Sequence, residues 1–321
     1  KRATMAFSRT TLRYLNRLLI DQRYDRVATS NLLTHTRVVE TQLFEDDERV
    51  IHIKNILSLV DGDSIRMGVV DGGIDDKARI HWNEAGLKIE FDASILSIDP
   101  KQFTNHLDVI VAMPSPRNLI RILPLLSSIG VDNIFLTGAE KVDQRFLASH
   151  YLQQKHAQKL HDLLRQGLEQ SGNLTKMPSV FKFPHLHALF KNIRKRDEEH
   201  GEEHGTYVKV LAHPRKASMQ RCEKTGELLS NYHIEYTIGD IPFPSSIDTT
   251  TQTKTPPCRM LLAIGPNAGW VSPTEINQFI SEGFTPVSLA GGLGNLKTEA
   301  AITALTVRAH ERLEMEHQQQ H

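Results

Sequence analysis

The pattern of hydrophobic and polar positions changes at about residue 100. Between residues 26 and 92, apolar and polar residues alternate over short runs, which turn residues interrupt at 61–63 and 71–73. Alternation with a period of two, bounded by such turns, is typical of half-buried β-strands. The pattern therefore predicts a small, mainly β domain over residues 21–100, with a linker at 96–106.

After residue 100, short apolar runs alternate with amphipathic helical stretches. The run LDVIVAM at 107–113 predicts a buried strand, residues 116–130 a helix, 131–138 a second strand, and 156–172 a long helix. This alternation predicts an α/β fold with a parallel sheet covered by helices, over residues 101–321. Pro124 lies within the first helical pattern, and we expect it to kink or interrupt that helix.

Three predicted strands in the last part of the chain end in small or helix-breaking residues. They are VKVLAHP at 208–214, LLAIGPNAGW at 261–270 and PVSLAGGLGNLK at 286–297. In an open α/β sheet, ligands bind outside the carboxyl ends of the strands, where backbone groups can read a base and a ribose. Since loops of Gly and Ala leave room for an adenine, the three loops predict one ligand pocket.

The segment VSPTEINQFISEGF, residues 271–284, predicts a helix with a marked start and end. Ser272 is the expected N-cap, Pro273 the first helical residue, and Glu275 the residue that completes a capping box. Gly283 is expected to end the helix.

Two segments have the composition of surface insertions. Residues 195–206 are charged and residues 242–257 are rich in Thr, Ser and Pro, so both predict exposed loops. His200 and His204 are spaced like a helical zinc pair, but the H-E-x-x-H order is absent. The sequence HLH at 185–187 lies on an amphipathic helical stretch without partner ligands, and we expect no metal site.

Composition excludes several classes of protein. The 38 Lys and Arg residues balance 38 Asp and Glu residues, so any binding of nucleic acid must depend on a local patch. Cys222 and Cys258 are too few for a disulfide framework and lack metal-ligand spacing, which indicates a reducing compartment. No apolar run has the length of a membrane span.

The first 20 residues contain five basic residues and no acidic one. This segment fits an organelle transit peptide, a basic arm that contacts RNA, or a helix with a solvated basic face. The expected location is the cytoplasm, or a mitochondrion or plastid if the segment is a transit peptide.

The sequence AGGLGNLKTEAA, residues 290–301, has the spacing of a P-loop with one residue changed. Gly291 and the pair Lys297 and Thr298 keep the pattern, whereas Leu296 occupies the position of the second glycine. A Leu side chain there obstructs the approach of backbone N–H groups to phosphate oxygens. No acidic strand end that could bind Mg²⁺ follows, so a nucleotide triphosphatase is disfavoured.

The run IGPNAGWVSPTEINQFISEGFTPVSLAGGLGNLKTEAAITAL, residues 264–305, resembles the C-terminal signature of RsmE-type small-subunit (16S) rRNA uridine-N3 methyltransferases of the SPOUT superfamily. The family pattern there is G-P-E-G-G-[FW], a capped helix, G-[FL]-x-P-V-x-L-G and then I-L-R-x-E-T-A. Segments 113–146, 165–180 (RQGLEQSGNLTKMPSV) and 52–73 also resemble the family. The similarity runs from about Leu18 to Leu313.

This resemblance implies a SPOUT trefoil-knotted parallel-sheet domain, preceded by a PUA-like β-barrel that positions RNA. It also implies S-adenosyl-L-methionine as cofactor, a homodimer, and small-subunit rRNA or the assembled subunit as partner. The sequence departs from the family pattern at the pocket. Asn267 and Ala268 replace Glu and Gly, and Lys297 stands where the family has Arg. An alternative is therefore a non-catalytic RNA-binding or ribosome-assembly protein on the same scaffold.

The resemblance and the strand ends together give the expected site. Lys297 is expected to stabilise the uracil anion as N3 loses its proton, and Arg117 to contact an RNA phosphate or to be an ordinary exposed arginine at a helix start. The residues expected to hold the cofactor, mainly through backbone groups, are Ala212, His213, Ile264, Gly265, Asn267, Gly269, Leu289, Gly291, Gly292 and Leu296.

Overall fold

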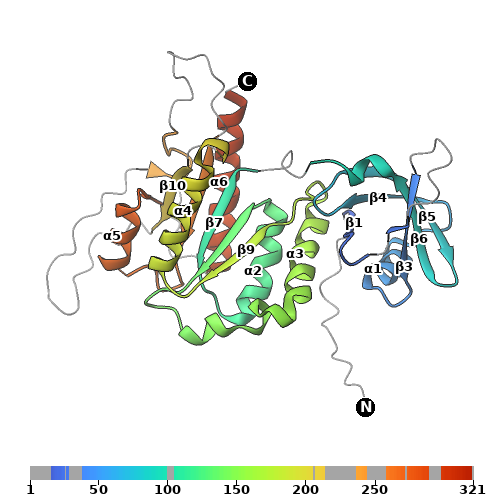
Figure 1. Ribbon diagram of the computed structural model, residues 1–321, viewed down its shortest axis with the longest axis horizontal. Helices are drawn as coiled ribbons and strands as arrows, with labels where there is room; N and C mark the ends of the chain where they lie inside the picture. Colours follow the sequence, from blue (N-terminus) through green and yellow to red (C-terminus); the bar gives the residue numbers. More distant parts are fainter. Residues whose placement is uncertain are drawn as a thin grey trace. The chain divides into compact units, whose positions relative to one another are not determined.

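The structure is a computed structural model of the 321-residue chain (Figure 1). The chain forms two compact units, Lys1–Thr104 with Arg165–Met177, and Asn105–Leu164 with Pro178–His321. The residues that the structure describes are 16–25, 27–28, 38–99, 105–204, 207–213, 236–243, 258–271, 273–288 and 298–319.

The first unit is built on a six-stranded sheet in the order β1-β4-β5-β6-β3-β2. All neighbouring pairs are antiparallel except β1 and β4, which are parallel. The predicted mainly β character is confirmed. Its elements are β1 (Leu18–Ile20), β2 (Val27–Ala28), β3 (Val38–Phe44), α1 (Glu48–His52), the π-helix η1 (Ile53–Leu57), β4 (Ser64–Val69), β5 (Ile74–Asn83), β6 (Gly86–Asp92) and the 3-10 helix η2 (Ala93–Leu96).

Alternation along the strands produces the core of this unit. In β3, Val39, Thr41 and Leu43 are buried, while the residues between them are partly exposed. Because successive side chains of a strand point to opposite faces, this pattern gives the sheet one apolar face. Ile80 of β5 and Ile89 of β6 pair in register on that face and are fully buried.

Residues 165–177, which include the GLEQ sequence, belong to the first unit by their contacts. The buried Arg17 side chain donates hydrogen bonds to the carbonyl oxygens of Gly172 (2.5 Å) and Met67 (2.8 Å). Thr175 donates to the carbonyl of Gly72 at 2.6 Å. Residues 165–177 were predicted to belong to the α/β domain, and residues 18–20 to a basic N-terminal arm. In the structure, residues 18–20 form β1 of the first unit.

Glu169 is the one acidic residue of this segment, and its side chain is buried. One carboxyl oxygen accepts the backbone N–H of Leu19 at 3.3 Å, and burial raises the pKa of Glu169 to about 7, against the opposing effect of the charges on Arg165 and Arg49. Burial disfavours the charged form of a carboxyl group. The group therefore keeps its proton in the folded protein at pH values where an unfolded chain has lost it.

Between about pH 4.5 and pH 7 the folded state binds more protons at Glu169 than the unfolded state does, so the free energy of unfolding falls as pH rises through that window. Glu169→Gln retains the acceptor for Leu19 and cannot titrate. In the unmodified protein we expect the free energy of unfolding, measured in urea, to fall by about 3 kcal/mol between pH 5 and pH 7.5 because of this group. In Glu169→Gln this part of the decline should be absent. Exposed Glu45→Gln is the control, and a decline of equal size in Glu169→Gln would contradict the assignment.

The second unit contains a seven-stranded parallel sheet in the order β11-β13-β10-β12-β7-β8-β9. The predicted α/β class is confirmed. Its elements are β7 (Leu107–Ala112), α2 (Pro116–Ile129), β8 (Asn133–Thr137), the 3-10 helices η4 (Gln144–Ala148), η5 (His150–Leu152) and η6 (Gln154–His156), β9 (Ser179–Phe183), α4 (Leu186–His204), β10 (Tyr207–Ala212), β11 (Tyr236–Thr237), β12 (Arg259–Ile264), α5 (Thr274–Ser281), β13 (Thr285–Ser288) and α6 (Thr298–Gln319). The helix α3 (Ala157–Ser171) begins in this unit and ends in the first.

Helices cover both faces of this sheet. α2 and α6 pack on each other, and α6 also packs on β7 and β12. α4 packs on β8 and β9, and its Phe190 meets Phe279 of α5 with ring centroids 5.1 Å apart. Right-handed crossovers assign these two groups of helices to opposite faces, as Figure 1 shows. Every residue of β7 and β12 is consequently buried.

Three expectations about helices need correction. α2 runs without interruption through Pro124, so the proline does not end it. Residues 195–204, expected to be a loop, continue α4, because charged residues are good helix formers. α5 begins at Thr274 with Pro273 as N-cap. The predicted stop at Gly283, which has a φ of 83°, is confirmed.

Candidate functional site

The carboxyl ends of β10, β12 and β13 lie side by side. Leu211 of β10 is in register with Ala263 of β12, and Ala212 with Val287 of β13. The backbone N–H of His213 donates to the carbonyl of Val287 at 2.9 Å. Three loops that are far apart in the sequence therefore leave the sheet at one edge, as the strand-end argument predicted.

A buried ionic network joins the amino ends of the strands, at the opposite edge of the sheet. Arg259, the first residue of β12, lies 3.1 Å from the carboxylate of Asp108 and 3.3 Å from that of Asp132. The hydroxyl of Tyr207, the first residue of β10, donates to Asp108 at 2.6 Å. Buried charges are stable only when they are paired in this way. The polar side chains of this edge thus bind one another.

The loop after β12 is tightly folded around Trp270. Gly269 has a φ of 69°, and its N–H donates to the carbonyl of Pro266 at 2.7 Å. Trp270 is buried and packs on Phe279 with ring centroids 4.7 Å apart. A Cβ atom on Gly265 would lie 3.1 Å from the indole nitrogen of Trp270, so any larger residue would require the loop to shift by a few tenths of an ångström.

Glu275 of α5 ties this loop to the loop that follows β8. Its carboxylate is buried and accepts the N–H of Val271 and the N–H of Glu140, each at 2.7 Å. Lys141 adds a second link by donating to the carbonyl of Ala268 at 3.1 Å. The capping box predicted between Glu275 and Ser272 involves a residue that lies outside the described part of the chain. Among the described residues, Glu275 holds together two loops that are far apart in the sequence.

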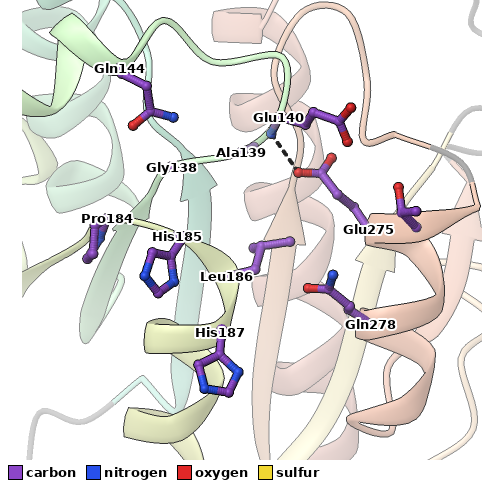
Figure 2. Close-up of a pocket in the computed structure, with 11 residues that line it drawn as sticks. Gly138, Ala139, Glu140, Gln144, Pro184, His185, Leu186, His187, Glu275 and Gln278 are labelled. Carbon is purple, nitrogen blue, oxygen red and sulfur yellow. Dashed lines mark hydrogen bonds between the residues drawn. The ribbon is translucent and has the colours of Figure 1, made fainter.

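A pocket of about 350 Å³ lies beside these loops, between the carboxyl ends of β8 and β9 and the start of α5 (Figure 2). A Cβ atom on Gly138 would lie 2.1 Å from the carbonyl oxygen of Pro184, so only glycine allows the two loops to approach here. The residues that line the pocket include Gln144, His185, His187 and Gln278. Among the described residues, none of those predicted to hold a cofactor lines this pocket.

The predicted site residues are distributed as follows. Ala212, His213, Ile264 and Gly265 meet at the carboxyl edge, and Asn267 and Gly269 lie in the loop after β12. Arg117 is exposed in the first turn of α2, which follows β7 at the same edge. The predicted residues Leu289, Gly291, Gly292, Leu296 and Lys297 lie outside the described residues.

Two further properties concern only the described part of the chain. There, no three His, Cys, Asp or Glu side chains are grouped as a metal site. No helix in those same segments is long and apolar enough to cross a bilayer.

The role of Glu275 leads to a prediction. In Glu275→Gln, the side-chain amide can accept only one of the two N–H groups, so the backbone N–H of Glu140 or of Val271 loses its acceptor. We expect amide hydrogen exchange in residues 265–271 and 138–141 to accelerate about tenfold, a change that corresponds to roughly 1.4 kcal/mol.

The matched control is Glu282→Gln, at the other end of the same helix, where the side chain pairs with Arg194 on the surface. Exchange rates in both loops that match those of the unmodified protein would show that Glu275 does not hold them.

Comparisons with known proteins agree with this architecture. The model of the RNA methyltransferase domain family matches residues 101–309. The chain is 33% identical over 134 residues to Ribosomal RNA small subunit methyltransferase E of Treponema pallidum (strain Nichols), a match that covers 42% of this chain and 48% of that protein. The match thus spans about half the length of this curated relative.

Two solved structures have a similar fold over nearly the whole chain. The probable rRNA-methyltransferase from Porphyromonas gingivalis has a TM-score of 0.53 at 17% identity, and covers 88% of this chain and 95% of its own. Ribosomal RNA small subunit methyltransferase E from Neisseria gonorrhoeae, bound to S-adenosyl methionine, has a TM-score of 0.54 at 18% identity, with 91% and 96% covered.

The fold expected from the resemblance, a PUA-like β domain followed by a SPOUT-type α/β domain, is confirmed by these similarities and by the two sheets. The family match covers well over half of the chain, including β7 to β13 and most of α6. The chain therefore belongs to the family of RNA methyltransferase domains, and its C-terminal signature resembles that of the RsmE type.

Proposed function

We propose that this protein transfers a methyl group from S-adenosyl-L-methionine to N3 of a uridine in small-subunit rRNA. The observation that carries the proposal is the convergence of the ends of β10, β12 and β13 at one edge, in a chain of this family. The similarity to a small-subunit rRNA methyltransferase, which covers about half of that protein's length, supports small-subunit rRNA as the substrate.

The residues at this edge fit such a cofactor. Ala212 and Gly265 add little side-chain bulk at this edge, which leaves room for an adenine and a ribose beside backbone groups. Trp270 packs closely against Gly265, and Asn267 is exposed in the same loop. When bound, the cofactor supplies an electrophilic methyl group.

The protein's own contribution to the reaction is to bind, orient and stabilise charge. Uracil N3 is protonated at neutral pH, so it must lose its proton as the N3–CH₃ bond forms and the S–CH₃ bond breaks. A cation beside the ring stabilises the negative charge that develops on uracil during this step. We assign that role to Lys297 and assign contact with an RNA phosphate to the exposed Arg117.

The proposal extends to partners and location. Because the chain has as many acidic as basic residues, naked RNA should bind weakly, and an assembled or partly assembled small subunit is the preferred substrate. The resemblance to SPOUT proteins supports a homodimer and a knotted path for the loop after β13. The proposed location is the cytoplasm, or an organelle if residues 1–20 are a transit peptide.

Two measurements test this function. Calorimetry should detect binding of S-adenosyl-L-methionine, and mass spectrometry of nucleosides should detect N3-methyluridine in isolated small subunits incubated with protein and cofactor. Subunits incubated without cofactor are the control. Cofactor binding without methyl transfer to any subunit preparation would favour the non-catalytic alternative, which the replacement of Glu and Gly by Asn267 and Ala268 suggests.

The assigned role of Lys297 gives a sharper prediction. Lys297→Ala should keep cofactor affinity within about threefold and lower the methyl-transfer rate by about 10² to 10³, because the lost interaction acts mainly in the transition state. Lys297→Arg, which has the family residue, should match or exceed the original rate. Transfer at an unchanged rate by Lys297→Ala would contradict the assignment.

A further inference from the structure

The pocket beside the cofactor loops has two facing walls of neutral polar side chains. His185 and His187 extend from the start of α4, and the amide of Gln278 extends toward them from α5, as Figure 2 shows. Gln144 lies on the rim contributed by η4. Leu186 and Ala139 add apolar surface between these groups.

The orientation of His185 is fixed by its own helix. Its Nδ1 atom accepts the backbone N–H of Ala188 at 3.2 Å, so this nitrogen carries no proton. In a neutral imidazole the proton then lies on Nε2, which is a hydrogen-bond donor. Gln278 contributes an amide that both donates and accepts, so the pocket offers both kinds of hydrogen-bonding group.

The charges near the pocket disfavour a phosphate inside it. Glu275 carries a buried carboxylate on one wall, while the carboxylate of Glu140 is directed away from the two histidines (Figure 2). The two cations that follow lining residues in the sequence already have partners, since Lys141 donates to the carbonyl of Ala268 and Arg145 pairs with Asp143 at 2.6 Å. The buried carboxylate on the wall therefore favours a neutral planar group inside the pocket.

Hydrogen bonds to Glu275 link the pocket to the loop of the proposed cofactor site. Glu275, which lines the pocket, binds both Glu140 at its rim and Val271 in the loop after β12. A ligand that occupies the pocket therefore contacts the residues that hold this loop. Its volume of about 350 Å³ is at the lower end of the range for small-molecule sites, which matches a base with its ribose.

We infer that this pocket binds an unstacked nucleobase of the RNA substrate, at a nucleotide other than the one that is methylated. The inference rests on the proposed function for the identity of the substrate. Single-stranded RNA is commonly read by stacking of bases on His or aromatic rings and by hydrogen bonds to the base edges. The imidazoles of His185 and His187 provide the rings, and Gln278 and Gln144 provide the edge contacts.

The test uses 5′-mononucleotides and the protein without cofactor. In NMR spectra of protein with labelled histidine rings, AMP, GMP, CMP or UMP should shift the signals of His185 and His187, whereas ribose 5-phosphate should not. Gln278→Ala should weaken binding of a short single-stranded RNA about tenfold. The matched control is Gln158→Ala, an exposed glutamine on α3 outside the pocket, which should leave RNA affinity unchanged.

The outcomes separate this inference from the proposed function. Methyl transfer that proceeds while no mononucleotide shifts the two histidine signals would overturn the pocket assignment and leave the activity intact. Equal shifts with ribose 5-phosphate would identify a phosphate site and would also overturn it. Base-dependent shifts that Gln278→Ala removes would support the assignment, even if methyl transfer were absent.

Discussion

Parallel pairing of β10 with both β12 and β13 is the constraint on which the rest of the site depends. In a parallel sheet every strand ends at the same edge, so loops from residues 213, 265 and 288 onward begin beside one another. The buried Arg259, Asp108 and Tyr207 network closes the amino edge and leaves the carboxyl edge for ligands. Glu275 and the close approach at Gly265 then fix the loop after β12.

The fold could be predicted well from the sequence wherever periodicity is local. Alternation in β3 and the fully apolar runs of β7 and β12 directly reflect burial on one or both faces. The errors have two different physical reasons. α2 tolerates Pro124 because its apolar face is buried, and residues 195–204 continue α4 because Lys, Arg and Glu are good helix formers even though their charge suggested a loop. No local pattern indicates that Arg165–Met177 belongs to the first unit.

The sequence predicts the part of the candidate site that depends on local features, and not the part that depends on contacts between distant loops. Small residues after β10 and β12 are visible in the sequence, and parallel topology alone brings Ala212 and Gly265 to one edge. The link from Glu275 to Glu140 and the pocket at His185 depend on which loops meet in space. The capping pattern at residues 272–275 drew attention to Glu275, but it could not indicate the bonds that this side chain accepts from Val271 and Glu140.

The central claim is that one cofactor binds at the shared carboxyl edge of β10, β12 and β13. Hydrogen exchange with and without S-adenosyl-L-methionine, read peptide by peptide, tests it most directly. Our account predicts that the cofactor protects amides in residues 212–213, 264–271 and 287–288 together, and leaves those of the amino-edge residues 107–108, 207–208 and 259–260 unchanged. Binding that protects only one of the three loops, or that protects the amino edge, would contradict the account.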